Sequence, residues 1–461
     1  MNVFVFFRDF RIEDNLGLYR AMKQCGEVVP IFCFTPEQIE PSRNDYFSHN
    51  SVHFLCESLL DLRSSIQSQN GELYIFHNDL TKVLKEIHQK SSIRSIHYNR
   101  DYTPYTKKRS SKIKSLCKSL DVTLYEHEDY LLAPIGTFMK PNDDPYTVYG
   151  PFKNNVYKSA SSIPKPKMKK SYMFKKQESL KQIQSIEYNL NKFYNTNNDI
   201  YVHGGRQLAK KLLQRAKKLN YETDRNTLSI ETSRLSAYIK YGNVSIREAF
   251  HALYGGKEGG LCNQFIWREF YYYIAYYYPE VLSKSANFQK KYDNVKWVTS
   301  KSLFKKWCDG ETGYPIVDAC MKQLNKTGYM HNRGRLISAN FLNRMLGMDW
   351  RLGEKYFATK LTDYDPIVNN GNWQWIASTG VDPKPYFQRL FNPWSQSQKA
   401  DQDAKYIKQW LPQLKNIPAN ELHEWDKHVD QYDLKEINYR KPIVDYKTAR
   451  EKSIQQYRNV L

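Results

Sequence analysis

The chain has 461 residues, too many for one typical hydrophobic core, so we expect two or three domains. A hydrophobic content of 41% with 15% aromatic residues excludes an intrinsically disordered chain. No apolar run is long enough to span a bilayer, and residues 1–10 are typical of a short strand, not of a secretion signal. We therefore expect a soluble, intracellular protein with no membrane partner.

Charge and cysteine usage narrow the choice of partner. The 69 Lys and Arg against 48 Asp and Glu give a net charge of +21, which favours a polyanionic partner, most simply nucleic acid. Charge alone does not separate DNA from RNA or from an anionic membrane. The seven cysteines are scattered and form no CxxC motif, so we interpret them as free thiols and predict no metal site.

Residues 1–130 alternate short apolar segments with amphipathic ones. Strands are predicted at residues 3–7, 28–34, 73–77, 93–98 and 122–125, with helical patterns between them, as at 54–69 and 81–89. Strands separated by helices of this length predict an α/β domain with a five-stranded parallel sheet, doubly wound. The segment contains no GxGxxG motif, so a dinucleotide site is not predicted there.

The pattern changes twice after the predicted sheet. Residues 131–198 carry several prolines and a run of lysines, which predicts an interdomain connector along the surface. Helical periodicity dominates residues 199–461, as at 204–219, 245–253, 261–278 and 334–346. We predict a large all-α domain there.

A cluster of hydroxyls precedes a predicted short helix that runs toward Lys240. The residues are Thr232, Ser233, Arg234, Leu235 and Ser236. Hydroxyls at a helix start cap free N–H groups, and the same N–H groups bind phosphate. Taken alone, the cluster is more often an ordinary N-cap than a phosphate site.

The predicted helix at 262–270 places Gln264, Trp267 and Arg268 on one face, because residues three and four apart are neighbours on a helix. An amide, a flat aromatic ring and a cation on one stripe are suited to line a pocket for a nucleobase. In isolation, an amphipathic helix with a core tryptophan is the better interpretation.

Residues 363–380 are the most informative segment. They contain the carboxylates Asp363 and Asp365, a group of carboxamides, and the indoles Trp373 and Trp375. Indoles offer stacking and electron donation rather than proton transfer, and few chemistries need them beside carboxylates.

Together with residues 7–15, 99–105, 313–319 and 327–335, these segments resemble the photolyase/cryptochrome family, most closely its class I cyclobutane pyrimidine dimer photolyases. The resemblance covers nearly the whole chain and is strongest over residues 200–410. It implies an antenna role for the α/β domain and an FAD cofactor in the helical domain. The residues expected to bind FAD are Tyr221, Thr232, Ser233, Arg234, Leu235, Ser236, Arg335, Asp363, Tyr364, Asp365 and Asn369.

The resemblance also implies roles for individual residues. Arg335 would pair with Asp363 beside the isoalloxazine ring, and Asn369 would face flavin N5. An electron-transfer chain would run through Trp297, Trp350 and Trp373. Gln264, Asn332, Trp267 and Trp375 would form the catalytic pocket. The expected DNA contacts are Arg225, Gln264, Trp267, Arg268, Tyr271, Asn332, Arg333, Trp375 and Gln396.

Two positions depart from the family pattern. Members that repair cyclobutane dimers usually carry Glu at the position of Gln264 and Trp at that of Tyr329. The glutamine at position 264 is similar to the residue of the (6-4) photolyases. The two pocket histidines of those enzymes, however, correspond here to Asn332 and Leu336. Tyr329 is similar to the DASH-type cryptochromes, which prefer single-stranded lesions.

The hypothesis from the sequence is a monomeric enzyme that acts on UV-damaged DNA. Excited, reduced FAD would donate an electron to a flipped-out cyclobutane pyrimidine dimer, held between Trp267 and Trp375, and recover it after ring opening. A (6-4) photolyase with an atypical pocket and a cryptochrome-type blue-light receptor are the alternatives. The antenna chromophore is left open between methenyltetrahydrofolate, 8-hydroxy-5-deazaflavin and none.

Overall fold

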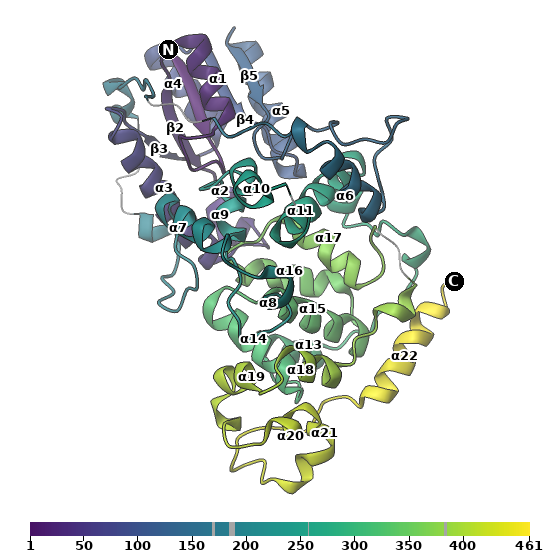
Figure 1. Cartoon of the computed structure of the whole chain (residues 1–461). Coiled ribbons are helices and arrows are strands. Elements are labelled where there is room, and N and C mark those ends of the chain that lie inside the picture. The colour runs from purple at the N-terminus through teal and green to yellow at the C-terminus, as the bar shows by residue number, and fades with distance from the viewer. Residues whose placement is uncertain (168–170, 184–189, 257, 382–384) are drawn as a thin grey trace.

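The sheet and the helical region occupy opposite ends of the molecule (Figure 1). This arrangement comes from a computed structural model that describes residues 1–461 except 168–170, 184–189, 257 and 382–384. The amino terminus lies at the sheet end, and the last helix packs along one side of the helical end (Figure 1).

Five parallel strands form one sheet in the order β3-β2-β1-β4-β5. They are β1 (Asn2–Phe6), β2 (Val29–Phe34), β3 (Tyr74–His77), β4 (Ser95–Asn99) and β5 (Thr123–His127). Each overlaps its predicted segment, so the predicted parallel, doubly wound sheet is confirmed. Parallel strands need crossover connections, and the intervening helices supply them.

Side chains of β1 alternate between the two faces of the sheet, as a strand repeat of two residues requires. Val3 and Val5 join the core beneath one pair of helices, whereas Phe4 and Phe6 join the core beneath the other pair. The first face is covered by α4 (Leu80–Ser91) and α5 (Pro104–Ser119), and the second by α1 (Leu16–Cys25) and α3 (His49–Gln67). A short helix, α2 (Pro36–Ile39), follows β2.

The predicted connector, residues 131–198, is partly helical. It contains α6 (Tyr149–Lys158) and several single turns, and Phe174 forms a parallel bridge with Val28 beside the sheet. Buried side chains of this segment, among them Phe138 and Phe152, belong to the same core as the sheet. Domain limits at residues 130 and 198 stay a prediction.

Helices make up the rest of the described chain. They are α7 (Arg206–Ala216), α8 (Tyr221–Asp224), α9 (Ser236–Lys240), α10 (Ile246–Tyr254), α11 (Gly260–Tyr277), α12 (Glu280–Ser283), α13 (Lys301–Asp309), α14 (Pro315–Thr327), α15 (Asn332–Asn340), α16 (Trp350–Lys360), α17 (Pro366–Ile376), α18 (Pro393–Ala400), α19 (Lys405–Trp410), α20 (Ala419–His423), α21 (Trp425–His428) and α22 (Tyr446–Arg458). The predicted helices at 204–219, 245–253 and 261–278 correspond to α7, α10 and α11. The one predicted at 334–346 is α15, continued by a π-helical turn at Phe341–Met345.

A buried charge network joins the two ends of the molecule. Arg247 on α10 lies 2.8 Å from Asp129 and 3.1 Å from Asp14, and Arg11 lies 2.5 Å from Asp129. All four side chains are almost inaccessible to water. Because a buried charge without a partner is strongly destabilising, the sheet domain depends on a guanidinium from the helical region.

Among the helices that the structure describes, none combines the length and the apolarity needed to cross a bilayer. The seven cysteines are free, and all but Cys25 are buried. Their prediction as free thiols is confirmed.

Candidate functional site

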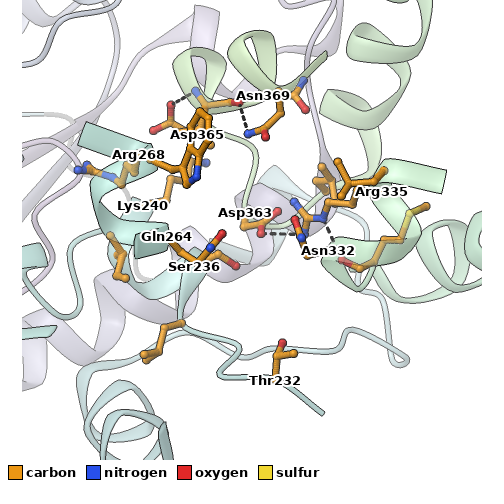
Figure 2. Close-up of a pocket in the computed structure, with 18 of the residues that line it drawn as sticks. Thr232, Ser236, Lys240, Gln264, Arg268, Asn332, Arg335, Asp363, Asp365 and Asn369 are labelled. Carbon is orange, nitrogen blue, oxygen red and sulfur yellow. Dashed lines mark hydrogen bonds and ion pairs between the residues drawn. The ribbon is translucent and has the colours of Figure 1, made fainter. Parts of the chain in front are cut away.

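A cavity of about 430 Å³ opens in the helical region, between the segment at 221–240 and helices α11, α15, α16 and α17. All but three of the residues predicted for the site line it. The exceptions are Trp297, Trp350 and Gln396. Figure 2 shows labelled polar side chains of the cavity lining, with Asp363, Asn332, Gln264 and Ser236 near the middle of the view.

The hydroxyl cluster forms a strained turn, not the N-cap that its sequence favours in isolation. Leu235 is the N-cap of α9 and makes no side-chain capping bond, and Arg234 adopts a positive φ of 57°. The Arg234 guanidinium stacks on Tyr201, 3.9 Å from the ring centre, and donates to its hydroxyl at 2.7 Å. Strained turns of this kind persist where the surroundings hold them, often at ligand sites.

A partly buried ion pair lines the cavity. Arg335 Nη2 is 2.9 Å from Asp363 Oδ2, and Arg335 Nε donates to the carbonyl of Met330 at 2.9 Å. Burial alone would raise the pKa of Asp363, but the Arg335 guanidinium outweighs it and lowers that pKa. The predicted Arg335–Asp363 pair therefore exists and is charged at neutral pH.

Asp365 lines the cavity, but protein groups use both of its carboxylate oxygens. Oδ1 accepts from the backbone N–H groups of Ile367 and Val368 and so caps α17. Oδ2 accepts from Arg8 at 2.8 Å and from the Tyr272 hydroxyl at 2.6 Å. Burial opposes ionisation, yet Arg8 and other donors lower the pKa of Asp365 to about 2. Asp365 thus fixes the start of α17 to the sheet domain.

Asn369 is held by a partner that the sequence did not indicate. Its Nδ2 donates to the backbone carbonyl and to the carboxyl of Glu354, at 3.1 and 3.0 Å. Among the described residues, the side-chain amide oxygen of Asn369 has no donor, so it can accept from a ligand in the cavity. Burial raises the pKa of Glu354 to about 7. Burial also lowers the pKa of Lys240, a separate residue of the cavity lining, to about 7.

Trp267 lines the opposite wall of the cavity with one face already covered. Tyr149 of α6 stacks on it with 3.6 Å between ring centres and 8° between planes. The Tyr149 hydroxyl donates to the backbone of Asn263 at 2.9 Å, which holds the ring in place. Tyr149 is a site residue that the sequence gave no reason to select.

Trp375 is supported in a similar way. The Arg389 guanidinium lies over its ring, 4.0 Å from the centroid, and also donates to the Trp375 carbonyl. Both indoles line the same cavity. Each is backed by a side chain from another element, so one face of each ring remains to stack on a ligand.

The two predicted catalytic amides differ from the rest of the lining. Within the described part of the chain, the side chains of Gln264 and Asn332 make no hydrogen bond, and both border the cavity. Next to Asn332, His331 caps α15 through Nδ1, which accepts from Arg333 N at 3.1 Å. Burial and the nearby arginines lower the pKa of His331 to about 4, so its ring is neutral.

Cations gather around these amides. Arg225, Arg268 and Arg333 line the cavity, and burial and Arg225 lower the pKa of Arg333. Arg268 Nη1 is buried without a protein partner among the described residues. Such groups favour an anionic ligand. Gln396, on α18, does not line the cavity, so its predicted DNA contact gains no support from this geometry.

The three predicted electron-transfer indoles differ in their exposure and in whether they line the cavity. Trp373 lines it and packs on α16, where a Cβ on Gly353 would come within 2.1 Å of the indole. Trp350 is the first residue of α16 and is buried, whereas Trp297 is partly exposed. The ring centre of a fourth indole, Trp307, lies 6.3 Å from that of Trp373. The sequence gave no reason to select Trp307.

The chain is similar to known proteins over almost its whole length. Residues 2–170 match the DNA photolyase family, and residues 261–459 match the FAD binding domain of DNA photolyase. The deoxyribodipyrimidine photo-lyase of Escherichia coli is 32% identical over 98% of both chains. An archaeal photolyase from Sulfolobus tokodaii, solved with two FAD molecules, covers 100% of both chains with a TM-score of 0.89 and 36% identity. A Synechocystis cryptochrome has the same fold, with a TM-score of 0.88, 24% identity, and coverage of 99% of this chain and 98% of that one.

Proposed function

Because this chain belongs to the DNA photolyase family, we propose that it repairs cyclobutane pyrimidine dimers in DNA by light-driven electron transfer. One observation carries the proposal. One cavity is lined by the Arg335–Asp363 ion pair and the Asn369 amide, which suit a flavin. The same cavity is lined by the indoles of Trp267 and Trp375, which suit a flipped-out pyrimidine dimer. A cryptochrome receptor needs the first set but not the second.

Residues that line the cavity fit FAD. The charged Arg335–Asp363 pair and the carbonyl of Asn369 offer a donor, an anion and an acceptor to the polar edge of an isoalloxazine ring. The hydroxyl-bearing residues Thr232, Ser233 and Ser236 line the cavity beside the start of α9, a group that suits a diphosphate. When bound and reduced, FAD supplies the light-excited electron that opens the cyclobutane ring.

The indoles would hold the lesion. Taking a dimer out of the duplex costs stacking and pairing, and aromatic stacking returns about 1–3 kcal/mol per base. Tyr149 and Arg389 keep Trp267 and Trp375 from rotating away, so little side-chain entropy remains to be lost on binding.

The unpaired amides would orient the dimer. Gln264 and Asn332 can donate to its carbonyl oxygens, where negative charge develops after electron transfer, and neither can supply a proton. Ring opening needs no proton, in contrast to reversal of a (6-4) photoproduct. Neutral His331, whose Nδ1 is occupied at the helix cap, supports this choice of lesion.

Arginine side chains around the opening would bind the damaged strand. Burial and the nearby Arg225 lower the pKa of Arg333, and a phosphate bound between the two side chains would relieve their repulsion. This contact is independent of sequence, as a repair enzyme requires. The monomeric state and the intracellular location stay predictions from the sequence, and the preference for single- or double-stranded DNA stays open.

Irradiation of the purified, flavin-loaded protein with two oligonucleotides tests the proposal. One carries a single cyclobutane dimer and the other a single (6-4) photoproduct. We expect light-dependent reversal of the first only. Reversal of the second would establish the (6-4) alternative, and no reversal of either would favour the receptor.

We propose that the antenna is one of three chromophores, with an empty antenna site as the alternative. Methenyltetrahydrofolate and 8-hydroxy-5-deazaflavin follow from the family resemblance, and a second FAD is added by the structure of the Sulfolobus relative. Absorption spectra of the chromophores released from the protein by denaturation distinguish them. An FAD stoichiometry of two per chain would identify the third.

A further inference from the structure

Two histidines and a glutamate meet on the surface of α3, away from the cavity. His53 and Glu57 are one helical turn apart on α3, and His203 belongs to the segment that leads into α7. One ligand atom from each lies within 4.8 Å of the other two. Glu57 Oε1 is 3.3 Å from His53 Nε2 and 2.8 Å from His203 Nδ1.

The backbone of the second segment is fixed against α3. Gly204 N donates to Glu57 Oε2 at 2.6 Å, and Arg206 N donates to Asp61 Oδ2 at 3.0 Å. A Cβ on Gly204 would lie 2.4 Å from the carbonyl oxygen of Phe54, so only glycine permits this approach. Figure 1 shows α3 and α7 side by side. The three side chains are therefore brought together by rigid elements and not by a loose loop.

A backbone hydrogen bond fixes the orientation of the Glu57 carboxylate, as hydrogen bonds to metal-binding carboxylates commonly do. Gly204 occupies Oε2, so Oε1 is turned toward both imidazoles. His53 is buried and stacks on Tyr194 with 4.4 Å between ring centres, which fixes its ring plane. His203 remains 55% exposed, so solvent reaches the cluster from one side.

We propose that His53, Glu57 and His203 bind a divalent transition metal ion of the zinc class, with a water molecule completing the coordination. Two imidazoles and one carboxylate are a frequent ligand set for zinc with an open position. Tetrahedral zinc with bonds near 2.0 Å separates its ligand atoms by about 3.3 Å, the spacing of His53 and Glu57. His203 Nδ1, which now shares a hydrogen bond with Glu57 Oε1, would bind the metal ion instead.

Such an ion would join the sheet domain to the helical region. The His203 carbonyl accepts from the Tyr238 hydroxyl of α9 at 2.7 Å. Two residues earlier, Tyr201 stacks on Tyr329, a residue that lines the cavity, with 4.6 Å between ring centres. The site is structural in this arrangement, and it does not depend on the photochemical reaction.

Metal titration of the full-length, flavin-loaded protein without a histidine tag tests this site. After chelator treatment, calorimetry with Zn²⁺ is expected to show one equivalent bound. His203→Ala, a change at a largely exposed residue, should weaken binding by about 10- to 100-fold. Glu57→Gln should weaken it similarly while its amide oxygen still accepts from Gly204. His49→Ala, one turn earlier on α3, is the matched control and should bind Zn²⁺ as the unmodified protein does.

Co²⁺ provides an independent spectroscopic measurement. We expect visible d–d absorption without a thiolate charge-transfer band, and we expect it to be lost in His203→Ala. Equal Zn²⁺ affinity of the unmodified protein and His203→Ala would overturn the proposal. A thiolate band would also overturn it, because a cysteine would then be the ligand.

Discussion

The two sides of the cavity differ in how their polar side chains are held. On the flavin side, Asp363, Asp365 and Asn369 each make one or more hydrogen bonds to protein groups. On the lesion side, Gln264 and Asn332 make none within the described residues, although both border the same space. In the proposed assignment, the first side is preorganised for a flavin that stays bound, and the second keeps its hydrogen-bonding capacity for a substrate that leaves.

Removing Asp365 tests the rigid side and has the largest expected effect. Asp365→Ala leaves Arg8 buried without one of its carboxylates and uncaps α17, which should cost about 3–5 kcal/mol of unfolding free energy and lower flavin content. Urea unfolding and the flavin-to-protein absorbance ratio measure it. Asp349→Ala removes a comparable cap from α16 in a more exposed position and should cost about 0.5–2 kcal/mol. Equal losses in the two variants would contradict the role of the Arg8 pair.

Trp373 tests whether electrons reach the flavin side through the predicted indoles. Phenylalanine is too poor an electron donor to replace it, so Trp373→Phe should stop photoreduction of oxidised flavin and spare repair by chemically reduced protein. Transient absorption and a repair assay measure the two. Trp307→Phe changes a neighbouring indole outside the predicted chain and should photoreduce normally. Normal photoreduction in Trp373→Phe would remove the chain from the mechanism.

Trp267 tests the lesion side. Trp267→Ala should weaken binding of dimer-containing DNA by about 1–3 kcal/mol, or roughly 5- to 150-fold, with flavin content unchanged. Fluorescence anisotropy gives the affinity. Tyr149→Phe keeps the supporting ring and loses only its hydroxyl, so its affinity should stay close to that of the unmodified protein. An unaltered affinity in Trp267→Ala would exclude stacking on this indole.

Glu354, the partner of Asn369, tests the proposed flavin side through the pH dependence of protein stability. Because burial raises its pKa to about 7, the folded protein holds a proton that the unfolded chain releases near its ordinary pKa. This contribution to stability is therefore lost as pH rises from about 4.5 through about 7. Glu354→Gln keeps an acceptor for Asn369 and cannot ionise, so it should stabilise the protein by about 1–2 kcal/mol at pH 8 and little at pH 5. Parallel stability–pH curves for both proteins would contradict a protonated Glu354.

Gln264 gives the smallest expected effect. Gln264→Glu restores the residue usual in cyclobutane dimer repair and should raise the repair yield by less than about tenfold, or 1.4 kcal/mol in barrier. The yield is measured per absorbed photon with fully reduced flavin. An equal or lower yield would contradict the role proposed for this amide.

Local sequence patterns predicted most of the fold and most of the residues that line the cavity. They did not predict the side chains that pack behind those residues. The strands at 3–7 and 28–34 follow from apolar runs, and the stripe of Gln264, Trp267 and Arg268 follows from helical spacing. The faces covered by Tyr149 and Arg389, by contrast, are set by tertiary packing between distant elements.

The same limit applied to the hydroxyl cluster and to the proposed metal site. An N-cap is the prior for hydroxyls before a helix, and only the positive φ of Arg234 shows another geometry. His53 and Glu57 are visible as an i,i+4 pair, but His203 follows 146 residues after Glu57. No local pattern relates residues at that separation.

The Arg247 network has a consequence for biosynthesis. Asp14 receives the Arg247 guanidinium from a residue 233 positions later, so a nascent chain presents this carboxylate before that partner exists, whereas Asp129 can already pair with Arg11. At about 5–20 residues per second, a ribosome needs roughly 10–50 seconds to supply Arg247. The sheet half is thus translated first but reaches its final, closed form only after α10 has emerged.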